Sequence, residues 1–275
     1  MKATTSNIVI IICILFTALQ FPSCQKDNGY TNRVNANSND DNSIHALPVD
    51  SSLVAWYTFN GDAHDHSGNN NNVVFNSATP TKGKAGLPKT AYAFDGTSSY
   101  MQINNSASIN PTKISLYALV KTTGFYQGTC HGNRILSKGY NDYASGRYLL
   151  GYDDQAYYNW NGCDQVVQNN RENPYGSYGD GTSASGANYL KGYIKPNVWY
   201  SLVYTYDGLN SKLYINGTLV SKIAQPTTFN ASSYPLFIGR NQDPSYPYYF
   251  KGLIDEIRIY KRVLNASEVA ALAKN

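Results

Sequence analysis

Oxygen-bearing side chains that could bind a metal ion occur in two separate parts of the sequence. One is a loop rich in Asp, Ser and Asn, which follows an apolar run and contains Asp62 and Asp65. The other is an apolar run near residue 260, which contains Asp255. Oxygen ligands in a flexible loop suit calcium. Because the first and last strands of a β-sandwich often lie side by side, we predict a structural calcium site at Asp65 and Asp255. Asp62 and Asp95 are further candidate ligands.

The same residues allow two alternatives. Asp65 could cap a turn while Asp255 accepts hydrogen bonds from backbone amides of the 60s loop, and this possibility stays open. Zinc bound by His64 and His66 is disfavoured, because no cysteine or third histidine lies near them in the sequence.

Aromatic rings next to amide groups could bind a sugar, and one region of the sequence concentrates both. Tyrosine accounts for 25 of the 275 residues, and many tyrosines lie between 126 and 193 among Asn, Asp, Gln and Gly. Sugars present flat C–H faces to rings and hydroxyl edges to amides, and Tyr is a rigid, amphipathic contact residue. The candidate ligand-binding residues are Tyr126, Tyr157, Tyr158, Asn159, Trp160, Asn161 and Tyr246. Tyr246 belongs to a second aromatic group with Tyr248 and Tyr249, around Pro244 and Pro247, which could line a neighbouring loop. The alternative is that these rings pack in the core or cover turns.

No group of residues matches a known catalytic arrangement. Retaining glycosidases need two carboxyl groups about 5–5.5 Å apart. The acidic residues clustered on a predicted strand are Asp255 and Glu256, which strand alternation directs to opposite faces. Neither a Gly-x-Ser-x-Gly motif nor a Cys–His nucleophile pair is present. We therefore predict no catalytic residues and a protein that is not an enzyme.

The stretch 249–264 must position Asp255, and its pattern has a period of two followed by a helix signal. The face predicted to be buried carries Leu253, Asp255, Ile257 and Ile259, and the opposite face carries Ile254, Glu256, Arg258 and Tyr260. Asn265 is a good N-cap, Glu268 completes a capping box, and Leu264 can pack on Val269. A strand that leads directly into a short helix is predicted.

Short apolar runs separated by turn residues fill the chain from residue 48 onward, which is typical of a β-sandwich. Asn216-Gly217 between two alternating runs predicts a hairpin with a type I′ turn. The stretch 197–208 is apolar on both faces and predicts a central strand, and 234–240 predicts another short strand. The predicted fold class is all-β: an antiparallel two-sheet β-sandwich over residues 48–275 with a short C-terminal helix.

Residues 1–23 have the features of a lipoprotein signal peptide. Their apolar run is too short to span a bilayer, and Phe21-Pro22-Ser23-Cys24 resembles a lipoprotein box, which implies a lipid on Cys24. An ordinary secretory signal is the alternative. Residues 24–47 are rich in Asn, Asp and Ser and predict a flexible tether. Residues 25–28 are similar to the surface-export signal of Bacteroides-group lipoproteins, which implies an outer membrane lipoprotein exposed at the cell surface.

Two cysteines remain once Cys13, within the signal, and Cys24 are set aside. Cys130 and Cys163 are predicted to form a disulfide, because an exported domain folds in an oxidising compartment. A metal site with His131 would lack two further ligands at useful spacing.

Both ends of the predicted domain, and two stretches between them, match one family pattern. The ranges are Leu53–Asn72 with its Asp-x-Ser-Gly-Asn loop, Ala91–Ile103, Lys113–Lys121, and Tyr249–Leu264. Together they resemble bacterial laminin-G-like domains of the concanavalin A-like lectin/glucanase superfamily. The resemblance implies a jelly roll, and it favours calcium because such domains often bind it. It implies little about function, since lectins, glycanases and adhesion modules share this fold.

The function that these features predict is a surface-anchored, non-catalytic lipoprotein that binds a polysaccharide or another glycan. The alternative is an adhesion or structural module that binds protein partners. A glycoside hydrolase or polysaccharide lyase is less favoured. The formal net charge of +4 comes without a basic patch interleaved with aromatic residues, which argues against nucleic acid. Contact with the membrane is expected only through the lipid on Cys24.

Overall fold

Fifteen strands and one helix make up the part of the chain that the computed structural model describes: residues 50–128, 132–140, 145–154, 172–180, 184–188, 194–227 and 230–275. All of these residues belong to the compact unit Ile44–Asn275. The predicted signal peptide, residues 1–23, and tether, residues 24–47, lie outside the described residues and stay predictions. Within the described ranges, no helix has the length and hydropathy needed to cross a membrane.

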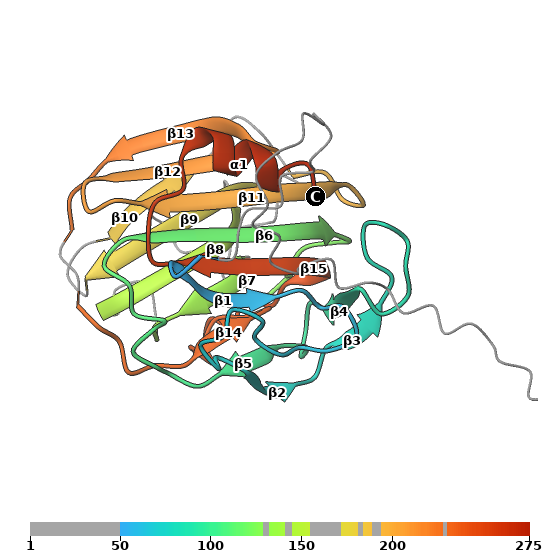
Figure 1. The fold of residues 1–275 in the computed structure, drawn as a ribbon. Coiled ribbons are helices and arrows are strands. Elements are labelled where there is room, and N and C mark those ends of the chain that lie inside the picture. The colour runs from blue at the N-terminus through green and yellow to red at the C-terminus, as the bar shows by residue number, and fades with distance from the viewer. Residues whose placement is uncertain are drawn as a thin grey trace, which may run out of the picture. The chain divides into compact units, whose positions relative to one another are not determined.

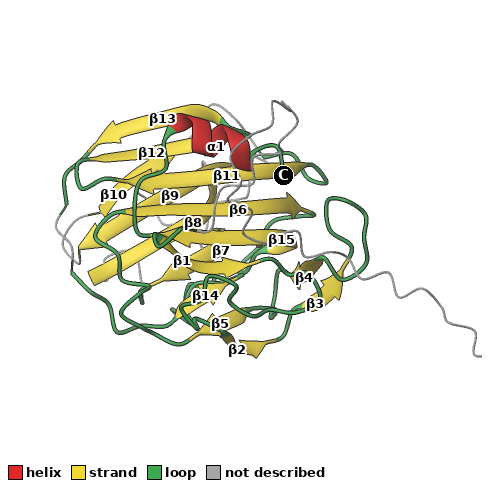
Figure 2. Cartoon of the chain, in the orientation of Figure 1, coloured by secondary structure: helices red, strands yellow, loops and turns green. Residues whose placement is uncertain are grey.

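The described strands form two antiparallel sheets that face each other (Figures 1 and 2). The first sheet contains β1 (Leu53–Tyr57), β3 (Thr79–Thr81), β4 (Ala91–Asp95), β6 (Ile114–Thr122), β11 (Trp199–Tyr206), β12 (Asn210–Ile215), β13 (Thr218–Ala224) and β15 (Lys251–Tyr260). The second contains β2 (Val73–Asn76), β5 (Met101–Ile103), β7 (Asn133–Lys138), β8 (Ser145–Asp154), β9 (Glu172–Asp180), β10 (Ala184–Asn188) and β14 (Leu236–Ile238). The predicted fold class is confirmed.

The main core lies between the two sheets, where inward-facing side chains of both are buried. Strand β6 shows how the sequence achieves this. Its residues Leu116, Ala118 and Val120 point into the main core, while Tyr117 and Leu119 belong to a second buried cluster on the outer face of the first sheet. Both faces are covered, so the strand is buried along almost its whole length.

Helix α1 (Ala266–Leu272) covers that outer face, across β11 and β12 in Figure 1. The predicted capping box is confirmed: the Asn265 side chain accepts from the Glu268 amide, and the Glu268 carboxylate accepts from the Asn265 amide. Val269 and Leu272 pack with Leu264 in the second cluster, so the predicted apolar contact at the helix start also forms. The helix therefore closes one outer sheet face.

Two local predictions are confirmed by the backbone. Asn216 and Gly217 have φ values of 49° and 81°, as a type I′ turn requires, and they join β12 to β13. Strand β11 pairs with both β6 and β12 and is therefore a central strand. The stretch Ala91–Ile103, which resembled one strand of the family, contains two: β4 in the first sheet and β5 in the second.

The predicted alternation of β15 is wrong in its first half because of a β-bulge. Ile254 pairs with Val120 and Glu256 with Leu119, so Asp255 is the extra residue of the bulge. Ile254 consequently lies in the main core while Leu253 and Asp255 are half-buried. Beyond the bulge the predicted phase holds, with Ile257 and Ile259 in the core. Strand β1 does pair with β15, as expected for the first and last strands.

Candidate functional site

The Asp65 carboxylate organises the loop after β1. Oδ1 accepts hydrogen bonds from the amides of Trp56 and Ser67, both at 2.9 Å, and Oδ2 accepts from the Ser67 hydroxyl and the Asn71 amide, also at 2.9 Å. Both oxygens are thus occupied by donors of β1 and of the loop itself. This agrees with the alternative in which Asp65 caps a turn.

The other three predicted calcium ligands accept from other groups, Asp62 within the same loop and Asp95 and Asp255 in two further loops. Burial alone would raise the pKa of Asp95, but hydrogen bonds from the Ser98 side chain and from three neighbouring amides hold it well below its usual value. Asp62 accepts from the His64 amide, and Asp255 accepts from the Lys84 amide at 2.6 Å, in the loop between β3 and β4.

No group of three or more His, Cys, Asp or Glu side chains in the described ranges could hold a metal ion. These residues do not fit one calcium cage made of the four carboxylates. Calcium itself stays a prediction, which melting curves recorded with calcium and with a chelator would test.

Replacing Asp65 with alanine is expected to lower the free energy of unfolding by about 1–2 kcal/mol, because amides of β1 and the loop lose their acceptor. Chemical unfolding measures the change. Asp62→Ala is the matched control in the same loop, where the carboxylate lies nearer solvent and a loss of only a few tenths of a kcal/mol is expected. Equal losses in the two variants would contradict this role of Asp65.

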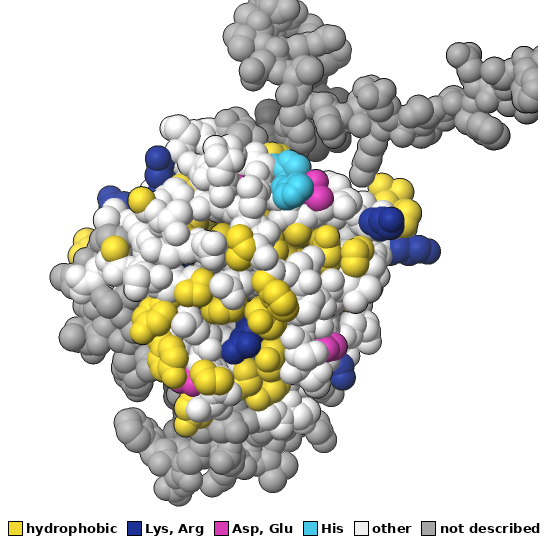
Figure 3. Space-filling view, turned by 90° about the horizontal axis from the view of Figure 1, so that it is seen from below, with side chains coloured by type: hydrophobic (Ala, Val, Ile, Leu, Met, Phe, Trp, Pro, Cys, Tyr) yellow, Lys and Arg dark blue, Asp and Glu magenta, His cyan; other side chains and the backbone are white. Residues whose placement is uncertain are grey.

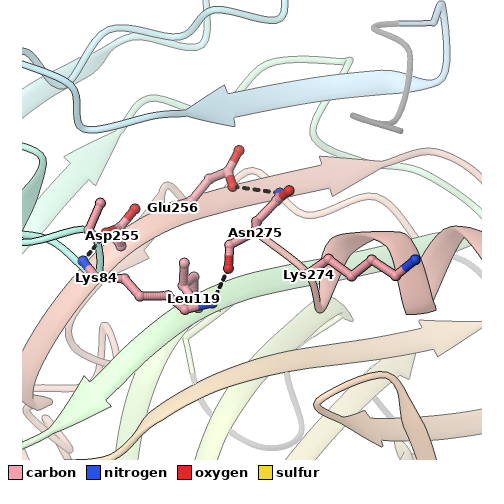
Figure 4. Close-up of a pocket in the computed structure, with 7 residues that line it drawn as sticks. Lys84, Leu119, Asp255, Glu256, Lys274 and Asn275 are labelled. Carbon is pink, nitrogen blue, oxygen red and sulfur yellow. Dashed lines mark hydrogen bonds between the residues drawn. The ribbon is translucent and has the colours of Figure 1, made fainter. Parts of the chain in front are cut away.

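The bulge in β15 also corrects the predicted geometry of Asp255 and Glu256. The sequence directed these carboxylates to opposite faces, but both line one pocket of about 340 Å³ together with Lys84, Leu119 and Asn275 (Figure 4). The extra residue turns the strand locally, so that two consecutive side chains reach the same side.

Glu256 is nevertheless engaged by its neighbours. Its Oε1 accepts from Trp56 Nε1 at 2.6 Å and from Arg258 Nε at 2.7 Å, and Arg258 is only 3% exposed. Burial opposes the charge of Arg258, but the Glu256 carboxylate keeps the pKa of the guanidinium above its ordinary value. This pair holds Trp56 and β15 together, while Asp255 is engaged by the Lys84 amide.

Most of the predicted ligand-binding residues fall outside the described ranges. These are Tyr157, Tyr158, Asn159, Trp160 and Asn161, and the same holds for Cys130, Cys163 and Cys24. Tyr126 and Tyr246 are described, and the structure brings them together through Tyr248, whose ring centroid lies 6.4 Å from that of Tyr126 and 6.1 Å from that of Tyr246. Tyr249 also contacts Tyr126, at 6.2 Å.

These tyrosines continue into a larger group of rings around Arg240. The Arg240 Cζ atom lies 5.0 Å from the ring centroid of Tyr100 and 5.4 Å from those of Phe237 and Tyr249. Phe75 stacks on Tyr100 with centroids 4.7 Å apart. We call this group the aromatic surface; it consists of Phe75, Tyr100, Tyr126, Phe237, Arg240, Tyr246, Tyr248 and Tyr249. On the face shown in Figure 3, hydrophobic side chains gather around a basic one.

The second sheet and one tied loop position these side chains. Phe75 lies on β2, Phe237 on β14, and Tyr100 just before β5. The loop after β14 is closed by backbone hydrogen bonds from Asn241 to Pro247 and from Phe250 to Gly239. Rings from distant parts of the chain therefore meet at one edge of the sandwich.

Tyr248 in that loop has a φ of 47°, a left-handed conformation that costs an aromatic residue roughly 1–3 kcal/mol. This conformation accompanies the placement of its ring 4.6 Å from the guanidinium of Arg134. Strain of this kind persists where surrounding contacts fix it, and such positions cluster at binding sites.

The aromatic surface combines accessible rings with buried supports. Phe75 and Tyr246 are 44% and 40% exposed, and Tyr100, Tyr126 and Tyr249 are half-buried. Burial, with the phenol of Tyr249 nearby, raises the pKa of Tyr126, so its hydroxyl stays protonated at neutral pH. The surface can pack against flat apolar faces of a ligand and donate hydrogen bonds from its hydroxyls and its guanidinium.

Four members of the surface were missed by the sequence analysis: Phe75, Tyr100, Phe237 and Arg240. Val74 and Phe75 are neighbours on one short strand, and both are exposed. Strand alternation normally buries one of two such residues, so no pattern in the sequence indicates an exposed Phe75. The convergence of the other three depends on which strands pair, and no local pattern shows it.

The fold and this surface define a laminin-G-type β-sandwich module with an exposed aromatic site. A family model described as the concanavalin A-like lectin/glucanases superfamily matches residues 95–270, and the chain belongs to this family. A comparison with curated proteins finds no match.

Solved structures share the fold at low sequence identity. Domain 4 of AbnA, a GH43 extracellular arabinanase from Geobacillus stearothermophilus solved in complex with arabinotriose, is 23% identical with a TM-score of 0.57, over 81% of this chain and 98% of that domain. The binding domain of Paraclostridial Mosquitocidal Protein 1 is 15% identical with a TM-score of 0.60, over 82% of this chain and 52% of its own. The botulinum neurotoxin serotype G binding domain is 16% identical with a TM-score of 0.58, over 81% of this chain and 50% of that domain. The chain spans about half of each toxin domain.

Proposed function

We propose that this protein is a non-catalytic carbohydrate-binding module that binds a polysaccharide at the aromatic surface. The observation that carries the proposal is the cluster of partly exposed rings around Arg240, which offers flat apolar faces beside hydrogen-bond donors. A sugar ring matches both, because its C–H faces pack on aromatic rings and its oxygens accept from charged donors. The arabinotriose complex of the arabinanase domain adds support by analogy of fold.

The proposal includes a lipid anchor at Cys24 that holds the module at the cell surface. Its support is the sequence of residues 21–24 and the polar stretch that follows them. Metabolic labelling with a palmitate analogue tests it: the wild-type protein is expected to carry label and Cys24→Ala to lose it.

Tyr246→Ala is expected to weaken polysaccharide binding about fivefold or more, since truncating an anchoring aromatic residue is expected to cost more than about 1 kcal/mol of binding energy. Affinity electrophoresis of the purified protein through gels that contain plant, algal and host polysaccharides measures the effect. Because Tyr246 is 40% exposed, thermal stability is expected to stay unchanged.

Tyr234→Ala is the matched control, an equally exposed tyrosine (39%) whose ring contacts Tyr140 and which is not a member of the aromatic surface. Trp160→Ala tests the second predicted binding stretch in the same gels. Retention that survives Tyr246→Ala but not Trp160→Ala would move the site to residues 157–161. Uniform migration of the wild-type protein in every gel would favour the protein-binding alternative, and release of reducing ends or unsaturated products would identify an enzyme.

A further inference from the structure

Arg240 has hydrogen-bonding capacity that the described residues do not use. Its Nε donates to the Asn241 carbonyl at 2.6 Å, Nη2 donates to the Gln242 carbonyl at 3.2 Å, and Nη1 donates to the Tyr249 hydroxyl at 3.5 Å. A guanidinium has five N–H groups. One N–H on each terminal nitrogen is therefore left over, and the side chain is half-buried, so it remains partly accessible.

The positive charge of Arg240 also lacks a carboxylate partner within the described part of the chain. Asp243, the acid nearest in sequence, is 7% exposed and accepts a hydrogen bond from the Ser245 amide. Arg134, the other guanidinium beside these rings, is different: it is 2% exposed and forms an ion pair with Asp153 at 2.7 Å. One arginine is thus neutralised inside the protein, while the other presents its charge among the rings.

The surrounding rings fix the position of that charge. Tyr100, Phe237 and Tyr249 lie within 5.0–5.4 Å of the Arg240 Cζ atom, and backbone carbonyls hold Nε and Nη2. A guanidinium held in one orientation loses little conformational freedom when it binds a ligand. The two free N–H groups match the two oxygens of a carboxylate, which guanidinium groups bind in pairs of hydrogen bonds.

We propose that the ligand of the aromatic surface is an acidic polysaccharide and that Arg240 binds the carboxylate of one of its uronic acid residues. This inference rests on the proposed carbohydrate-binding function and specifies its ligand class. The rings contact the C–H faces of the sugars, and the guanidinium selects the acidic residue among them. The same arrangement disfavours purely neutral chains, which leave the charge without a counter-ion.

Matched polymers that differ only in charge test the proposal. Polygalacturonate, alginate and hyaluronan are each compared with their carboxyl-reduced forms by isothermal titration calorimetry of the purified protein. At least one acidic polymer is expected to bind about tenfold or more tightly than its reduced form, as a charge-assisted pair would give. The difference is expected to shrink as salt is added, because ions screen exposed charges.

Variants separate the contribution of charge from that of the rings. Arg240→Gln is expected to abolish the difference between acidic and reduced polymers, and Arg240→Lys to retain only part of it. Tyr246→Ala is expected to lower the affinity for the acidic polymer and for its reduced form by the same factor. Melting curves check the fold of each variant, and the wild-type comparison of the polymer pairs does not depend on any variant folding.

Equal affinity of the wild-type protein for acidic and reduced polymers would overturn the acidic specificity and leave the proposed function in place. Preference for a polymer whose charge comes only from sulfate groups, such as dextran sulfate, over all three uronates would overturn the carboxylate assignment. A charge preference that persists in Arg240→Gln would remove this residue from the site. Absence of binding to every polymer, charged or neutral, would refute the proposed function and this inference with it.

Discussion

Replacing Glu256 with alanine is expected to lower the free energy of unfolding by about 3–5 kcal/mol, because it leaves the charge of Arg258 buried without its carboxylate. Glu256 Oε1 lies 2.6 Å from Arg258 Nη2 and also accepts from Trp56 Nε1. The Arg258 Cζ atom lies 4.7 Å from the centroid of the Trp56 ring, which shields the guanidinium from solvent. Urea unfolding, with the midpoint and the slope both recorded, measures the loss.

The double variant Glu256→Leu with Arg258→Met is the control for this prediction. Removing both charges is expected to recover much of the stability, since an apolar pair avoids the desolvation of two ions. A single variant that costs less than about 1 kcal/mol would mean that Arg258 finds water or another acceptor, and the pair would then contribute little.

Stability is expected to increase between about pH 8 and pH 10, and Lys138 is the reason. This side chain is fully buried and donates to the Ser232 carbonyl at 2.8 Å. Burial lowers the pKa of Lys138 from its ordinary value of 10.5 to about 8. Between these values the unfolded chain binds more protons than the folded one, so raising the pH favours folding. The gain is about 2–3 kcal/mol, after an allowance for residual solvent screening.

Above pH 10 the trend is expected to reverse. Burial raises the pKa of the buried tyrosines Tyr57, Tyr117, Tyr148 and Tyr204 above their ordinary value of 10.0. Unfolded tyrosines then lose protons that the folded ones keep, so rising pH favours unfolding. Melting temperatures across this range are expected to pass through a maximum near about pH 10.

Lys138→Met is the control, with an unbranched side chain that fills similar space without a charge. Its stability is expected to show no rise between pH 8 and pH 10. A wild-type profile that is flat in this window, or an identical rise in Lys138→Met, would contradict the assignment of the effect to Lys138.

The features that the sequence predicts correctly are those encoded by neighbouring residues. The hairpin at Asn216-Gly217 and the helix cap at Asn265 need only a few adjacent side chains to form, and both are confirmed. The predicted alternation of β15 is wrong at Asp255, because a bulge depends on the register with β6 and no residue pattern within the strand indicates it.

The same distinction between local and long-range features applies to the residues of the candidate site. Tyr246 was recognised because it lies in a loop dense in Tyr and Pro, and Tyr126 because of its tyrosine-rich surroundings. Arg240 and Phe75 could not be assigned, because their shared surface exists only after β2, β5 and β14 have paired. The predicted calcium ligands were chosen for their chemistry, and sequence alone does not reveal that Asp65, Asp255 and Asp95 serve three different loops.

The place of β15 in the first sheet has a consequence for how the chain folds. This strand, the last along the described chain, lies between β6 on one side and β1 and β4 on the other. During synthesis, β1, β4 and β6 emerge well before it, and their pairing with β15 waits until residues 251–260 follow. Assembly of this sheet must then join segments about two hundred residues apart, a topology that folds slowly. The first sheet therefore stays open until residues 251–260 have been synthesised.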